Sequence, residues 1–160
     1  MKEKPLAELT LRKYERPFRL TGRELVKKMC LSVGLLQPAD TRDVIVDVFY
    51  SMLRSESMTA SELEEAVKKC RKHHNLPLKG VASSNIRRQV KRLKDAMFVE
   101  KMGNLYRIAE NAALHELFTE RIEKFYLPAI VSRVKEYCEA VEKERWKHGS
   151  NVSKMQKSDE

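Results

Sequence analysis

Positive charge gathers in one short stretch of this sequence. Ten of its 32 Lys and Arg residues lie between Lys68 and Lys94, and no Asp or Glu lies among them. The rest of the chain carries 22 basic residues against 23 acidic ones, so the formal net charge of +9 comes from this stretch. Like charges at this density repel one another, and the binding of an anionic partner would offset this repulsion. An anionic partner is therefore expected rather than a merely solvated face, and nucleic acid is favoured over a membrane surface.

The first part of the basic stretch has a partly structural explanation. In "SMTASELEEAVKKCRKHH", Thr59 and Glu62 form a capping-box pattern, and acids precede bases as the helix macrodipole favours. We expect a helix here. Cys70 and His73 have a zinc-like spacing, but no second ligand pair follows at the spacing of a zinc finger. No metal and no cofactor are expected, and Cys70 is interpreted as a small core residue.

The second part, "SSNIRRQVKRLKDAM", predicts an amphipathic helix. Ser83 or Ser84 is expected to cap its start. Ile86, Val90 and Leu93 fall on one face, and the basic side chains fall on the other. One side of this helix is expected to pack against the core while the other is offered to the partner.

Directly after this helix the apolar residues recur with a period of two, which is typical of a β-strand. In "FVEKMGNLYRIA", Gly103-Asn104 is typical of a two-residue hairpin turn. The resulting register pairs Val99 with Ile108 on the core face. Glu100 and Arg107 are expected to pair across the strands on the other face.

Two more helices are expected before the basic stretch. Thr21 and Glu24 form a second capping-box pattern, which predicts a helix over 22–33 that ends at Gly34. Asp40 or Thr41 could cap the next segment, "RDVIVDVFYSMLRS". Its β-branched run is compatible with a strand, but its apolar residues recur at helical spacing, so helix is favoured.

The chain after the hairpin reads as helix from 111 to 146, with a kink or a break expected at Pro128. Its long apolar stripe requires a covering surface. The stripe could pack on its own domain, but a dimer seam shared with the 22–33 helix is preferred, because DNA-binding proteins often pair two half-sites. The polar segment 147–160 is expected to be disordered.

The order helix, helix, basic helix and hairpin over 41–109 resembles the winged helix-turn-helix family of DNA-binding domains. The resemblance covers a little under half of the chain. It implies a mainly α fold with a small β-hairpin, a winged helix-turn-helix core with N- and C-terminal helical extensions. The expected segments are an N-terminal arm and helix (1–40), the winged-helix domain (41–109), C-terminal helices (110–146) and a disordered tail (147–160).

The resemblance implies that residues 84–96 match the recognition helix, which lies in the major groove of DNA. Arg88 and Arg92 are then candidates for base contacts, since a guanidinium can bond guanine O6 and N7 together. The cations on the flanks and the hairpin would meet phosphates. The complete set of expected DNA-binding residues is Lys79, Ser84, Asn85, Arg87, Arg88, Lys91, Arg92, Lys94, Lys101, Asn104 and Arg107.

These patterns favour a double-stranded DNA-binding protein, a sequence-specific transcriptional regulator that acts as a homodimer through its N- and C-terminal helices. The alternatives are a winged-helix protein-protein assembly module and a nonspecific chromatin or RNA-binding protein. An enzyme is not expected, because the sequence has no phosphate-cradling Gly-rich loop and no paired carboxylates. Three scattered cysteines, no apolar signal region and no membrane-length stretch predict a cytoplasmic protein without a membrane partner.

Overall fold

The computed structural model of the protein describes residues 2–156. The chain divides into two compact units. The first is Leu9–Arg121, and the second combines the N-terminal residues up to Glu8 with the chain from Ile122 onward. Each unit is described separately.

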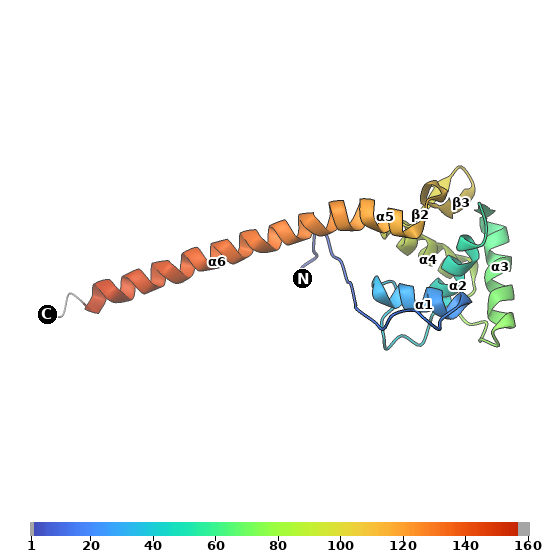
Figure 1. The fold of residues 1–160 in the computed structure, drawn as a ribbon, viewed down its shortest axis with the longest axis horizontal. Coiled ribbons are helices and arrows are strands. Elements are labelled where there is room, and N and C mark those ends of the chain that lie inside the picture. Colours follow the sequence, from blue (N-terminus) through green and yellow to red (C-terminus); the bar gives the residue numbers. More distant parts are fainter. Residues whose placement is uncertain (1, 157–160) are drawn as a thin grey trace. The chain divides into compact units, whose positions relative to one another are not determined.

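Helix α2 (Val44–Leu53) lies at the centre of the first unit. It contacts α1 (Gly22–Ser32), α3 (Ala60–His73) and α4 (Ser83–Asp95), as Figure 1 shows. Because neighbours cover it on several sides, its β-branched residues are all buried, which explains its strand-like composition. The predicted helix is confirmed. Its buried apolar side chains are those of Val44, Ile45, Val46, Val48, Phe49 and Met52.

A three-stranded antiparallel sheet contacts α2, α3 and α4. β2 (Val99–Met102) and β3 (Leu105–Ile108) form the predicted hairpin, and Val99 pairs with Ile108 as expected. At the turn only Gly103 has a positive φ, +61°, as in type II′ turns. The sequence did not predict β1 (Met58–Thr59), which pairs with β3 and gives the strand order β1-β3-β2.

The predicted helix starts differ in outcome. The capping box of α3 is confirmed, since the Glu62 amide donates to Thr59 Oγ1 over 3.2 Å and the Thr59 amide donates to Glu62 Oε2 over 3.0 Å. At α1, Thr21 occupies the N-cap position, but its side chain makes no capping hydrogen bond. At α2 the N-cap is Asp43 rather than Asp40 or Thr41, and its side chain makes no capping bond either.

Four buried charged side chains join α1, α2 and α3. Arg23 Nε donates to Asp47 Oδ1 over 2.8 Å, and its Nη2 lies 2.9 Å from Asp43 Oδ2. Arg71 Nη1 lies 2.7 Å from Asp47 Oδ2 and 3.0 Å from Asp43 Oδ1. Arg71 Nε also donates to the Pro77 carbonyl over 2.6 Å. The cluster thus fixes three helices and the loop after α3, with two positive charges facing two negative ones.

The N-terminal helix belongs to the same unit as the predicted winged-helix segment, so residue 40 is not a boundary in the structure. Arg23 and Cys30 of α1 are buried against this unit. Gly34, with φ +76°, ends the helix as predicted. The buried side of α1 thus packs within this unit, and the dimer seam predicted to include this helix stays a prediction.

Helical structure follows the hairpin, first as the 3₁₀ turn Ala109–Asn111 (η1) and the short helix α5 (Leu114–Leu117). The π-helical stretch Phe118–Tyr126 (η2) comes next, and α6 (Leu127–Gln156) completes the chain. Pro128 lies where the π-helical stretch changes to α-helix, and helical structure continues across it without the break that the sequence allowed. The expectation of a disordered tail is corrected for residues 147–156, because α6 continues through them. Residues 157–160 lie outside the described residues.

Candidate nucleic-acid interface

Helix α4 divides its side chains between the core and the surface as predicted. Ile86, Val90 and Leu93 are buried under the hairpin and α2. Five cations of the expected interface are exposed on this helix. Arg92, whose side-chain hydrogen bonds are described below, is one of them. The other four are Arg87, Arg88, Lys91 and Lys94.

None of these four cations forms an ion pair with any residue that the structure describes. The acidic residue on the same helix is Asp95, at its last position. By contrast, exposed cations on α6 pair with acids three positions away, as Arg133 does with Glu136 over 3.2 Å. The positive charge on α4 is therefore not neutralised within this part of the chain.

The start of α4 is held by side chains other than the predicted caps. The N-cap is Ala82, and Ser83 Oγ donates instead to Glu64 Oε1 of α3 over 2.5 Å. Asn85 Nδ2 donates to the Gly80 carbonyl over 2.6 Å. Gly80 has φ +81° and lies so close that an added Cβ would be 3.1 Å from Asn85 Nδ2. Asn85, an expected DNA contact, is half-buried and positions the helix instead.

The end of α4 is closed by a Schellman motif. The Phe98 amide donates to the Leu93 carbonyl and the Met97 amide donates to the Lys94 carbonyl. Met97 occupies the position that usually requires glycine, with φ +70°. This explains how the chain leaves the helix without a glycine at this position.

Arg92, expected to read bases, is directed elsewhere. Its Nη2 donates to the Leu35 carbonyl over 2.6 Å, and its Nη1 donates to Gln89 Oε1 over 3.0 Å. Leu35 lies in the connection between α1 and α2, so Arg92 anchors α4 to that connection. The two residues are 57 positions apart in the sequence, so no local pattern could predict their contact. Of the two predicted base-reading arginines, Arg88 has no hydrogen-bond or ion-pair partner among the described residues.

The hairpin offers fewer free cations than predicted. Arg107 Nε donates to Glu100 Oε1 over 2.7 Å, which confirms the predicted cross-strand pair. A backbone hydrogen bond from the Glu110 amide, together with Arg107, holds the pKa of Glu100 below its usual value. Lys101 Nζ lies 5.7 Å from the centre of the Tyr106 ring.

The remaining expected contacts lie on the surface. Asn104 is exposed at the hairpin turn, Lys79 is exposed in the loop before α4, and Ser84 is exposed in the first turn of α4. Exposed apolar side chains also occur at the hairpin tip, where Met102 is 53% exposed and Leu105 is 37% exposed. Neither residue is among the expected DNA contacts.

The rest of the basic stretch lies on α3, and its cations differ in burial and in partners. Arg71 is only 4% exposed and belongs to the buried charge cluster. Lys69 and Lys72 are exposed. Lys68 Nζ lies 3.8 Å from Glu65 Oε1. The count of ten cations therefore overstates the charge that is available to a partner.

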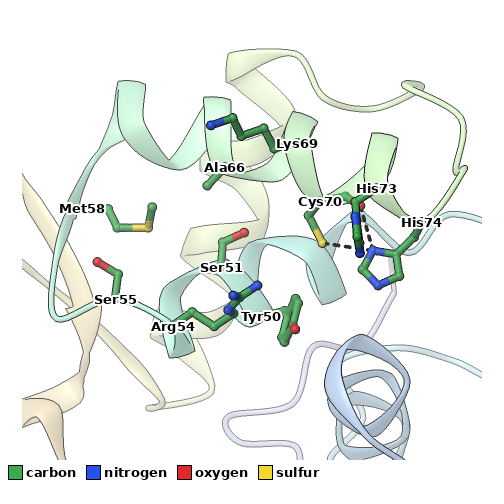
Figure 2. Close-up of a pocket in the computed structure, with 10 residues that line it drawn as sticks. All are labelled: Tyr50, Ser51, Arg54, Ser55, Met58, Ala66, Lys69, Cys70, His73 and His74. Atoms are coloured by element: carbon green, nitrogen blue, oxygen red, sulfur yellow. Dashed lines mark hydrogen bonds between the residues drawn. The ribbon is translucent and has the colours of Figure 1, made fainter.

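A hollow of about 430 Å³ lies between α2 and α3, and Figure 2 shows its lining. Cys70 is half-buried there rather than a core residue, and burial raises the pKa of its thiol to about 11. His74 Nδ1 donates to the Cys70 carbonyl over 2.8 Å. No group of three or more His, Cys, Asp or Glu side chains within the described residues could hold a metal ion.

No helix in the described part of the chain combines the length and apolar character that a membrane span requires. Comparison of the chain with models of protein families, with curated proteins and with solved structures gives no match.

Proposed function

We propose that this protein binds double-stranded DNA through α4 and acts as a sequence-specific transcriptional regulator. The observation that carries the proposal is the exposed set Arg87, Arg88, Lys91 and Lys94, which has no ion-pair partner among the described residues. The major groove of DNA is about 12 Å wide and admits one helix. Phosphates on both sides of the groove would neutralise the flanking cations.

Within this proposal, Arg88 contacts base edges and the other three cations contact phosphates. Arg88 lies on the exposed face opposite the buried Val90 and Leu93, so it points to the floor of a groove that α4 enters. Arg92 contributes indirectly, because its bond to the Leu35 carbonyl sets the position of α4.

The proposed winged helix-turn-helix architecture is supported by the order α2, α3, α4, β2, β3 and by the contacts of the hairpin. β2 contacts α4, and β3 pairs with β1 at the start of α3. The hairpin is thus held beside the basic helix, where Lys101 and Asn104 could reach the backbone of the same DNA.

A protein-protein assembly module is the second candidate function. The observation that favours it is the apolar tip of the hairpin, where Met102 and Leu105 are exposed next to each other across the strands. Apolar side chains at a tip gain little from contact with phosphates, whereas a protein surface could bury them.

A salt titration distinguishes these candidates. The full-length protein is titrated into a labelled random-sequence DNA duplex, and the dissociation constant is measured by fluorescence anisotropy at several salt concentrations. If about six phosphates are contacted, the logarithm of the association constant falls with the logarithm of salt with a slope near −5. Lys91→Ala reduces the magnitude of this slope by about one, because one phosphate contact is lost. Lys143→Ala, on α6, leaves the slope unchanged. Absence of binding at low salt would contradict DNA binding and favour the assembly module.

A further inference from the structure

Helix α6 carries an apolar stripe that nothing in the described structure covers. Val131, Val134 and Val141 are 41%, 55% and 64% exposed, and Cys138 between them is exposed as well. Their spacing of three, four and three residues places them on one face of the helix with the period of a coiled-coil seam. Every residue from 131 to 145 is exposed, so no described residue buries this stretch of α6.

Two opposite charges lie along one edge of this stripe. Lys135 and Glu142 are seven residues apart, so they share an edge but are separated by about 10.5 Å along the helix axis and cannot pair within one chain. Lys135 makes no ion pair with a described residue. Glu142 is contacted by Arg145 over 3.4 Å on the exposed surface.

We infer that α6 pairs with α6 of a second copy of this chain in an antiparallel arrangement. If Cys138 of one copy lies opposite Val141 of the other, Lys135 of each copy lies beside Glu142 of its partner. The contact is self-complementary, as a two-fold interface requires, and it forms the ion pair twice. One stripe thus supplies both the apolar seam and the charges that fix its orientation.

A parallel arrangement is less favourable because of Arg145. This residue continues the stripe by one further step, so parallel helices place the two Arg145 side chains against each other in the seam. In the antiparallel arrangement Arg145 lies opposite Val134, where its aliphatic stem covers the valine while its charge stays in water. The inference concerns a surface apart from α4 and does not depend on DNA binding.

Charge reversal tests the pairing directly. The dimer dissociation constant of the full-length protein is measured by analytical ultracentrifugation. Lys135→Glu and Glu142→Lys each weaken the dimer by about tenfold or more, because each places two like-charged pairs at the seam. The double variant restores the wild-type constant to within about threefold. The matched control Lys143→Glu, on the opposite face of α6, changes the constant by less than about threefold.

Two results would overturn the inference. One is a protein that remains monomeric at about 100 μM, well above the constant expected for a stable dimer. The other is a double variant that is no tighter than either single variant, since rescue across seven residues requires a contact between two chains. Circular dichroism of each variant checks that the helix is retained.

Cysteine crosslinking fixes the orientation. A disulfide requires Cα atoms within about 7 Å, so Val141→Cys links readily to Cys138 of the partner in the antiparallel arrangement. The control Val141→Cys with Cys138→Ser does not link, because residues 141 are offset along the axis. Rapid linking of the wild-type protein through Cys138 alone would show a parallel pair and contradict the inference. Cys30 does not interfere, because it is buried and burial raises the pKa of its thiol to about 12.

Discussion

Arg71 on α3 and Asp47 on α2 form an ion pair of 2.7 Å inside the core of the first unit. Both side chains are almost fully buried, although Arg71 belongs to the most basic stretch of the sequence. Asp43 and Arg23 complete the cluster and balance its charge. An arginine in a basic stretch can thus stabilise the fold instead of contacting a partner. Substitution of such a buried arginine lowers stability, whereas substitution of an exposed one does not.

Arg71→Ala is expected to destabilise the protein by about 3–5 kcal/mol, because it leaves the buried Asp47 and Asp43 with one buried cation, Arg23, instead of two. The other cation near Asp43, Lys27, is partly exposed and 3.7 Å away. Urea denaturation of the wild-type and variant proteins measures this free energy of unfolding. Lys72→Ala, the exposed neighbour, is the control and should change stability by less than about 0.5 kcal/mol. Equal effects of the two substitutions would show that the buried cluster does not stabilise the fold.

Stability is expected to fall in acid because of Asp43. Burial favours the neutral form of its carboxyl, but hydrogen bonds from Arg23 and Arg71 outweigh burial and hold its pKa below the usual value of 3.8. A pKa lowered in the folded state adds stability that is present above about pH 4 and is lost as the pH falls through the lower value. Urea denaturation between pH 7 and pH 3 measures this loss. Asp43→Asn should make the free energy of unfolding depend less on pH. If the dependence is unchanged, other carboxyl groups cause it.

Gly34→Ala is expected to destabilise the protein more than Gly103→Ala. Both glycines have positive φ, so each substitution costs about 1–2 kcal/mol of backbone strain. At Gly34 the added Cβ would also lie 2.7 Å from Thr10 Cβ, whereas at Gly103 it meets nothing within 4 Å. The difference between the two melting temperatures therefore measures how closely the segment around Thr10 packs on α1. Equal losses would mean that this segment moves away at no cost.

Arg92→Ala is expected to lower stability without changing which DNA sequence is preferred. The substitution removes the hydrogen bond to the Leu35 carbonyl, a loss of about 1 kcal/mol for a partly exposed charged donor. Arg88→Ala is the matched control and should leave stability unchanged, since Arg88 is exposed and makes no ion pair with a described residue. A change of base preference in Arg92→Ala with unchanged stability would restore Arg92 as a base-reading residue.

Features that depend on local pattern could be predicted from the sequence. The hairpin register follows from alternation around Gly103-Asn104, and the start of α3 follows from the spacing of Thr59 and Glu62. The buried face of α4 follows from helical periodicity. In each case the residues that decide the structure lie within a few positions of one another.

Features that depend on contacts between distant segments could not be predicted in this way. The buried position of Arg71 requires two carboxylates from α2, more than 20 residues away, to meet it in space. The bond of Arg92 to Leu35 spans 57 residues. Strand β1 has only two residues, so its pairing with β3 rather than its composition defines it. These contacts occupy two of the ten cations of the basic stretch, Arg71 and Arg92, of which only Arg92 was an expected DNA contact.

Selection of binding sites by the wild-type, Arg88→Ala and Lys94→Ala proteins tests the central claim most directly. The account predicts that Arg88→Ala loses about 1–3 kcal/mol on the preferred site and loses the preference at one base pair. Lys94→Ala, on the flank of α4, should weaken binding to all duplexes alike and keep the same preferred sequence. If the two variants weaken binding equally on every sequence, α4 does not read bases, and the claim of a sequence-specific regulator is contradicted.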